Sequence, residues 1–325
     1  ETGSEIELGF DASMFDGRAG LEFTFYSQST KDALISVPDP PSSGFTGSHL
    51  ENVGDISNKG IEILLTATPI LGSNFAWDAS LSVSGNKNRL VDFAGARDEI
   101  TFGAFASVQR HREGFPLGGF WAVDVERDSN GVPVLTSGGS AIVANTCTWT
   151  PNEPGWDQAT DCEEIFMGSS VPTREAALTS TFTLMGNLRL YFQFDYKGGG
   201  YQWCAICSIR NRVDRNSFEV NDPNATAEET ARWRSRQTLS HIFKSDFVKW
   251  RELSLTYSFP RRWAQALRAE RVSFTVSGRN LFVWTKYEGT GDPEVSFYSR
   301  RDFTKLDYAS LPMVRRLAAS VRVVF

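Results

Sequence analysis

Apolar and polar residues alternate along much of the chain with a period of two. Between positions 74 and 91, five apolar side chains alternate with five small or polar ones: Phe75, Trp77, Ala79, Leu81 and Val83 against Ala76, Asp78, Ser80, Ser82 and Ser84. A β-strand places successive side chains on opposite faces, so this stretch predicts a strand with one apolar and one polar face. Further strands of this kind are predicted over 3–14, 18–30, 56–69, 175–185, 187–198, 246–259, 270–285 and 316–325.

The alternation is interrupted at a few positions. Leu64 falls on the polar face of its predicted strand, and Lys249 and Arg251 fall on the apolar face of theirs. A β-bulge adds one residue to a strand and disrupts the pairing locally. We therefore expect bulges at these positions, or places where a strand extends beyond an apolar band.

Strand length and the spacing of turns favour a barrel that crosses a membrane. Strands of soluble sandwiches average about five or six residues, whereas a tilted strand that crosses a bilayer needs about nine to eleven. The connections alternate between short ones, at 15–17, 71–73, 186 and 261–269, and long ones, at 36–55, 93–174, 199–244 and 286–312. Outer-membrane barrels have short periplasmic turns and long extracellular loops. The sequence thus predicts an all-β fold, an antiparallel transmembrane β-barrel, with a soluble β-sandwich as the competing interpretation.

The number of predicted strands is odd. There are about nine, or eleven if a hairpin near Asn130 and Gly131 is added. Antiparallel bacterial barrels close with an even number, and an open sheet in lipid would leave two edges of unpaired backbone. We therefore expect residues 1–325 to be the C-terminal part of a larger barrel, whose first strands precede Glu1.

Composition narrows the functional classes. The formal charge of −6 is spread along the chain without a basic stripe, so we expect no nucleic-acid partner. The carboxylates alternate with apolar neighbours as wall residues do, and no serine lies in a nucleophile motif beside a suitable histidine. The histidines, His49, His111 and His241, are scattered. We therefore predict no enzyme activity, no cofactor and no metal site.

The four cysteines lie in two near pairs within predicted loops. Cys147 with Cys162 and Cys204 with Cys207 suggest disulfides and an oxidising compartment. Free thiols or, for the second pair, a metal site are the alternatives, and three full pairings are possible. Five aromatic residues of the long loops suit either stacking on sugar rings or packing within the loops: Trp121, Trp149, Trp156, Tyr201 and Trp203.

Several stretches resemble one family. They are ENVGDISNKGIEILLTATPI (51–70), EGFPLGGF (113–120), SDFVKWRELSLTYSFP (245–260) and SGRNLFVWTKYEGTGDPEV (277–295), together with the terminal Phe325. In this order they resemble the C-terminal part of SusC/RagA-type TonB-linked (TonB-dependent) transporters of the bacterial outer membrane. The resemblance implies a barrel of about 22 strands closed by an N-terminal plug, which these residues lack.

The resemblance also implies function and partners. Such transporters import oligosaccharides or peptides, receive them from a SusD-like surface lipoprotein, and are driven by the TonB complex acting on the plug. The motifs Asn280-Leu281-Phe282 and Asp292-Pro293-Glu294 mark the family, and we expect them to shape the loop after strand 270–285 rather than bind substrate. Phe325 resembles the signal that the barrel-assembly machinery recognises. A passive porin-like or adhesin barrel is the alternative function.

Overall fold

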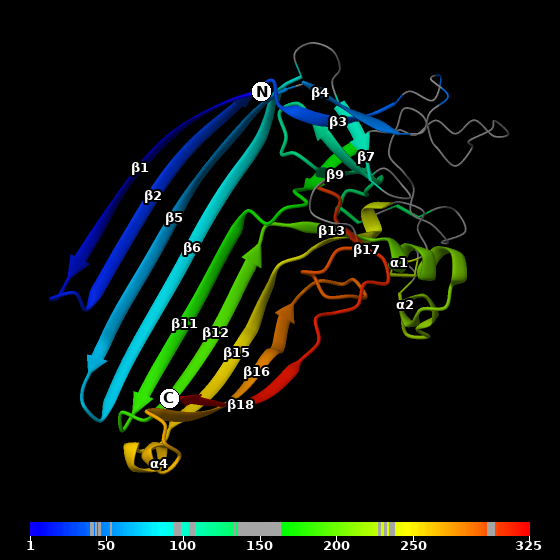
Figure 1. Cartoon of the computed structure of the whole chain (residues 1–325). Coiled ribbons are helices and arrows are strands. Elements are labelled where there is room, and N and C mark those ends of the chain that lie inside the picture. Colours follow the sequence, from blue (N-terminus) through cyan, green and yellow to red (C-terminus); the bar gives the residue numbers. More distant parts are fainter. Residues whose placement is uncertain are drawn as a thin grey trace.

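The computed structural model shows a tall, curved sheet with smaller elements at one end (Figure 1). The structure describes residues 1–39, 42, 44, 47–52, 54–93, 99–103, 108–132, 134–135, 164–226, 229–230, 233, 238–297 and 303–325. The two chain ends lie at opposite ends of the sheet (Figure 1).

The main sheet has nine antiparallel strands whose spatial order follows the chain. They are β1 (Thr2–Met14), β2 (Ala19–Lys31), β5 (Asp55–Leu71), β6 (Phe75–Asp92), β11 (Arg174–Leu184), β12 (Leu188–Gly198), β15 (Phe247–Ser258), β16 (Arg271–Thr285) and β18 (Arg316–Val324). Every predicted strand is confirmed, with boundaries that differ by at most two residues. The strands β1 and β18 form the two edges.

The long connections carry the remaining elements. These are the hairpin of β3 (Leu34–Pro38) and β4 (Ser48–Asn52), a sheet of β7 (Glu99–Phe102), β8 (Gln109–Arg112), β9 (Gly119–Val123) and β10 (Glu164–Gly168), and a sheet of β13 (Tyr201–Cys204), β14 (Ile242–Lys244) and β17 (Leu306–Asp307). The helical segments there are α1 (Ala205–Ser208), η2 (Ile209–Asp214), α2 (Phe218–Asn221) and η3 (Thr238–His241). At the opposite end, α4 (Arg261–Ala266) lies in the connection between β15 and β16 (Figure 1). Among the described residues, no helix has the length and apolar character needed to span a membrane.

The turn near Asn130 and Gly131 lies outside the main sheet. There the amide of Asp128 donates to the carbonyl of Val132 at 2.9 Å, and no strand of this segment joins the nine. The additional pair of strands considered from the sequence is therefore absent from the main sheet as described.

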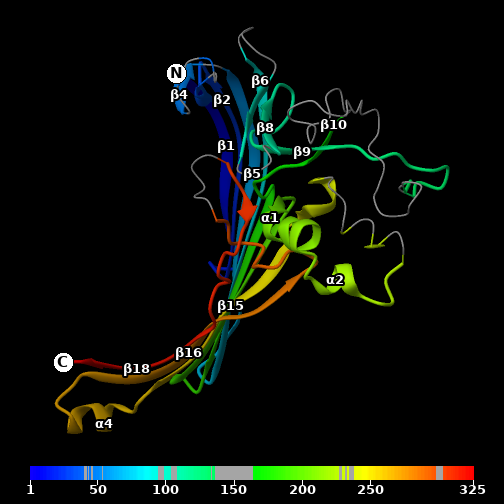
Figure 2. The same ribbon diagram turned by 90° about the vertical axis from the view of Figure 1, so that its right-hand side faces the viewer.

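One face of the main sheet is apolar across its width. Phe23 pairs with Phe10 on one side and with Ile63 on the other, and aromatic rings continue the face where Trp77 stacks on Phe182 at 5.8 Å. Many of these side chains stand exposed: Leu8 is 64% exposed. Seen from the side, the main sheet is a single curved layer, with most loop elements to one side of its upper part (Figure 2). An exposed apolar face of this extent fits lipid contact better than water.

A bulge explains the misplaced cations of β15. The register against β12 and β16 shifts between Trp250 and Glu252, so Arg251 is an extra residue. As a result Lys249 lies opposite Asp195 on the polar face, not on the apolar face as simple alternation predicts. Leu64 has no such bulge, because it pairs in register with Glu22 and Ser82 and is a partly buried residue of the polar face.

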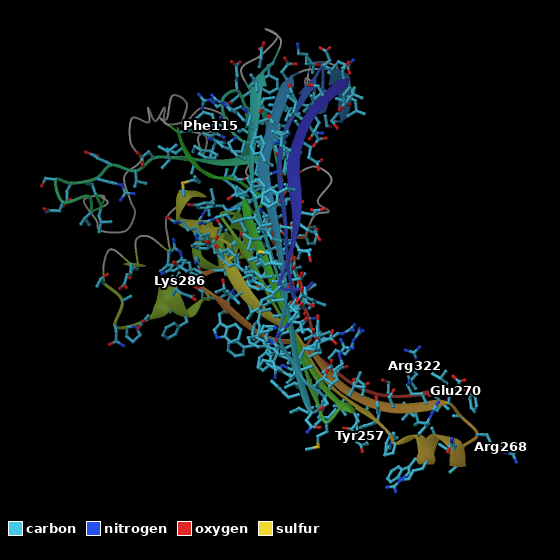
Figure 3. All side chains as sticks on the ribbon, turned by 90° about the vertical axis from the view of Figure 1, so that its left-hand side faces the viewer. Phe115, Tyr257, Arg268, Glu270, Lys286 and Arg322 are labelled. Carbon is cyan, nitrogen blue, oxygen red and sulfur yellow. A yellow bond between two sulfur atoms is a disulfide. The ribbon has the colours of Figure 1, made fainter. Side chains whose placement is uncertain are left out.

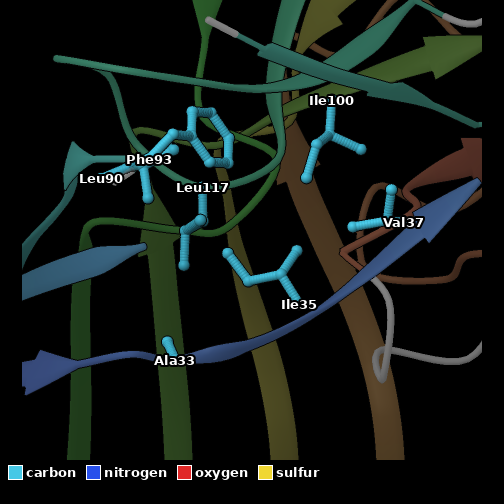
Figure 4. Packing of buried hydrophobic residues seen from close by; sticks show 7 residues of the cluster. All are labelled: Ala33, Ile35, Val37, Leu90, Phe93, Ile100 and Leu117. Carbon is cyan, nitrogen blue, oxygen red and sulfur yellow. The ribbon is translucent and has the colours of Figure 1, made fainter. Parts of the chain in front are cut away.

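Small hydrophobic cores hold the long connections together. One cluster combines residues in and just before β3, residues at and just after the end of β6, one residue of β7 and one of the loop before β9, as Figure 4 shows: Ala33, Ile35, Val37, Leu90, Phe93, Ile100 and Leu117. Because Leu90 and Phe93 are fully buried, the connection after β6 is anchored at the end of the sheet where the long loops gather.

Candidate functional site

The segment that returns from β16 to β18, residues 286–315, touches the main sheet and both larger loop sheets. We call it the return segment, and its described parts are 286–297 and 303–315. It contains the Asp292-Pro293-Glu294 motif and the strand β17, which pairs with β13. Three groups of contacts hold it in place: one with β15 and β12, one around Asp307 of β17, and one with β8.

The first contact is a buried group of charges on the polar face of β15. The Lys249 ammonium donates to both carboxylate oxygens of Asp292 at 2.7 Å and to Glu294 at 2.8 Å. The side chains of Lys249 and Asp292 are only 3% and 7% exposed. A buried charge is costly unless an opposite charge lies beside it. Here the Lys249 ammonium and the Asp292 carboxylate neutralise each other.

Arg251 extends the group to β12. Its Nε donates to Asp195 at 2.6 Å, and its terminal nitrogen donates to Glu294 at 2.7 Å. Burial alone would raise the pKa of Glu294, but the hydrogen bonds from Arg251 and Lys249 outweigh it and lower that pKa to about 2. Two cations and three carboxylates thus clamp the return segment onto the sheet.

The residues of the first family motif sit at the same bulge. Asn280 has φ +51°, and it lies in the part of β16 that is skipped in the pairing with β15. Asparagine tolerates this left-handed conformation better than most residues, and its amide also donates to the carbonyl of Val314 at 3.3 Å. Leu281 is skipped too, and Phe282 is half exposed on the apolar face beside Trp284. All three motif residues thus lie at the bulge beside the docked return segment.

The second contact surrounds the buried carboxylate of Asp307 in β17. The hydroxyl of Tyr287 donates to Asp307 at 2.9 Å, and the amide of Gly291 donates at 3.0 Å. Burial raises the pKa of the Tyr287 phenol, and the Asp307 charge raises it further. A disulfide joins Cys204 and Cys207 beside this group, where Cys204 pairs with Asp307 across the sheet.

The third contact joins the return segment to β8. The Gln109 amide, 2% exposed, donates to the carbonyl of Phe303 at 2.8 Å and accepts from the Lys305 amide at 3.1 Å. Nearby, the His111 ring accepts from the amide of Gly118 at 3.1 Å. Burial lowers the pKa of His111 to about 4, so this ring is neutral at physiological pH.

Beside the charge cluster, a groove of about 580 Å³ lies on the polar face. Its charged lining residues come from β2, β5, β11 and β12: Glu22, Glu62, Glu175, Asp195 and Lys197. Lys197 pairs with Glu175 at 3.1 Å, and Asp195 is held by Arg251. Within the described residues no ion pair neutralises Glu22 or Glu62, so the groove is acidic toward β2.

Among the described loop aromatics, Trp121 and Trp203 are buried rather than available for stacking. Trp121 is 4% exposed and packs against Phe115 and Phe166, and Trp203 is 5% exposed within the core under β13. Tyr201 packs against that same core. Of the two alternatives expected from the sequence, burial favours packing within the loops for Trp121 and Trp203, while Tyr201 stays partly exposed. Trp149, Trp156, Cys147 and Cys162 lie outside the described residues.

The family described as TonB dependent receptor-like, beta-barrel, matches residues 1–281. The chain belongs to this family. The structure of the RagAB peptide transporter has the same fold, with a TM-score of 0.75 at 20% identity, over 99% of this chain and 35% of that one.

Relatives of this TonB-dependent receptor barrel match along most or all of its length. TonB-dependent receptor P3 of Formosa agariphila is 26% identical over 353 residues, which cover all of this chain and 34% of that receptor. TonB-dependent receptor SusC of Bacteroides thetaiotaomicron is 24% identical over 301 residues, or 88% of this chain and 29% of that receptor. The chain spans about a third of the length of these curated relatives.

Family membership orients the structure. It confirms the predicted TonB-dependent receptor barrel and its location in the outer membrane. The matches to SusC and to the RagAB structure agree with the SusC/RagA-type resemblance of the sequence. The apolar face therefore contacts lipid, and the polar face with its groove, charge cluster and return segment faces the barrel interior.

Proposed function

We propose that this barrel segment belongs to an energy-coupled importer of oligosaccharides or peptides. The observation that carries the proposal is the clamp on the polar face, where Lys249 and Arg251 hold Asp292 and Glu294. It keeps the return segment folded against the polar face, and we infer that this segment narrows the interior of the complete barrel. A barrel with a narrowed interior is consistent with an importer that needs energy to open a passage for its substrate. The likeness to the RagAB peptide transporter supports the same class.

The proposal includes segments and partners beyond these residues. Residues 1–325 would form the C-terminal part of the barrel, with the first strands pairing to the edges β1 and β18 and an N-terminal plug filling the interior. The acidic groove between β2 and β12 offers a surface for that plug. The TonB complex would act on the plug, a SusD-like lipoprotein would cover the loop end, and the exposed Phe325 would guide assembly. The name RagAB peptide transporter supports peptides as one substrate class.

Growth experiments distinguish the two substrate classes. A strain that lacks the complete protein is supplied with defined oligosaccharides or with peptides as sole nutrient, with and without the gene restored. We expect growth to fail on one class and to return with the gene, and a SusD-like lipoprotein to co-purify with the restored protein. Unimpaired growth of the deletion strain on both classes would refute the substrate proposal, and purification without a lipoprotein would refute the partner.

A further inference from the structure

The helix α4 sits on the lipid-facing side of the barrel wall. Its Ala264 is fully buried, and together with Ala269 it packs against Val272 at the start of β16. Val272 pairs with Val323 and belongs to the apolar face. In Figure 3, α4 lies on the opposite side of the β16 and β18 ribbons from Arg322, a residue of the polar face. The turn between β15 and β16 therefore folds outward against lipid, not into the interior.

This turn is strongly basic. Residues 261–271 contain four arginines and one glutamate, a local charge of +3 in a chain whose total is −6. The side chains of Arg261, Arg262 and Arg268 are exposed, and none of them forms an ion pair within the described part of the chain. Arg268 lies at the tip of the turn (Figure 3). Three unpaired guanidinium groups thus project from one short connection.

Apolar side chains stand beside these charges. Trp263 stacks on Phe259 with ring centres 5.5 Å apart and is still 53% exposed, and Leu267 is 60% exposed. Phe259 in turn contacts Tyr257 edge to face, which continues the apolar face of β15. Tryptophan with an apolar body and a polar N–H is typical of the boundary between headgroups and acyl chains.

The position of the turn sets its depth in the membrane. It lies at the end of the main sheet that carries the other short connections (Figure 1). In outer-membrane barrels that end is periplasmic. The helix α4 therefore lies at the headgroup level of the periplasmic leaflet.

We propose that the α4 turn binds the headgroups of anionic phospholipids in the periplasmic leaflet of the outer membrane. Arg261, Arg262 and Arg268 contact the phosphate groups, while Trp263 and Leu267 enter the acyl boundary. Arginine suits this role because its planar guanidinium binds phosphate oxygens through two parallel hydrogen bonds. Lipid is the occupant because the apolar side chains continue a face that already contacts lipid. The proposal depends on the membrane location and not on the transport function.

The test measures lipid binding to the complete protein in detergent solution. Short-chain phosphatidylglycerol is titrated and counted by native mass spectrometry, with zwitterionic phosphatidylethanolamine as the comparison lipid. The variant Arg261→Gln/Arg262→Gln/Arg268→Gln is set against Arg189→Gln/Arg316→Gln/Arg322→Gln, whose arginines lie on the polar face. Because each basic side chain near an anionic surface contributes roughly fivefold, we expect the α4 variant to bind phosphatidylglycerol on the order of 100-fold more weakly at low salt.

Each outcome decides the proposal. An unchanged Kd for the polar-face variant, unchanged phosphatidylethanolamine binding, and loss of the wild-type preference at high salt support it. Equal phosphatidylglycerol binding by wild type and the α4 variant overturns it, and leaves the turn to another occupant such as a periplasmic protein. An equal loss in both variants also overturns it, because the effect then follows total charge. Unfolding temperatures of all three proteins verify that the variants fold.

Discussion

Replacing Lys249 by methionine tests whether buried charge holds the return segment on the wall. Methionine fills a similar volume without charge. The change leaves Asp292, whose side chain is 7% exposed, next to Glu294 without the cation that bridges them. Removing one partner of a buried ion pair costs about 3–5 kcal/mol. We take the lower end, about 3 kcal/mol, because Arg251 still neutralises Glu294 and the Glu294 amide still donates to Asp292 at 3.0 Å.

This loss falls on the docking of the return segment, because β15 keeps its backbone pairing to β12 and β16. Hydrogen exchange reads such local opening directly. A cost of about 3 kcal/mol corresponds to amide exchange faster by on the order of 100-fold over residues 289–295. Exchange in β15 and β16 should be unchanged.

Two further variants make the result specific. Arg279→Met removes a cation whose side chain is 60% exposed, 3.1 Å from Glu252, and should cost less than about 1 kcal/mol. The double variant Lys249→Met/Asp292→Leu removes both buried charges and should restore most of the protection. If Lys249→Met exchanges no faster than Arg279→Met over residues 289–295, the clamp does not hold the segment and the reasoning is wrong.

Three other predictions concern the bulge, the buried histidine and the terminal residue. Asn280→Val should lower the free energy of unfolding, measured in urea, by about 1–2 kcal/mol, because valine strains the left-handed backbone at φ +51°. Asn280→Gly should have nearly the wild-type free energy of unfolding. Equal losses in both variants would refute the bulge argument. Burial lowers the pKa of His111 to about 4, so the unfolded ring takes up a proton below pH 6.5 while the folded ring does not. Stability of the β7–β10 sheet should therefore fall from pH 6.5 to about 4, and His111→Gln should flatten that part of a pH series of unfolding temperatures; an unaltered profile would contradict this. Phe325→Ala should reduce the amount of protein in outer-membrane fractions, whereas Val323→Ala on the same strand should not; similar amounts would exclude an assembly role.

The main sheet could be predicted from sequence because the two faces of each strand meet different environments, lipid and the polar interior. The polarity of each residue therefore indicates which face of the strand its side chain occupies. The alternation in 270–285 and 316–325 thus gave strand boundaries within two residues. Simple alternation placed Lys249 on the wrong face, and the bulge expected there from the break in the pattern is present at Arg251. The pattern alone does not show on which side of the extra residue the phase changes.

The loop region was less predictable because its contacts join distant residues. The strands β7 to β10 have four or five residues, too few for a clear period. The partner of Lys249 lies 43 residues further along, and Gln109 meets Phe303 across 194 residues. The two out-of-phase cations, Lys249 and Arg251, were the available signal for the clamp. Trp121 is likewise buried by Phe166 of β10, more than 40 residues away, so the local sequence around Trp121 does not indicate its burial.

Energy dependence tests the central proposal most directly. The measurement is the initial rate of labelled substrate entry into cells that produce the complete protein, with TonB present and with TonB deleted. An importer whose interior is narrowed by the clamped return segment should take up substrate only when TonB is present, and entry should stop when the proton-motive force is collapsed. Entry at the same rate without TonB would show a passive pore and contradict the account.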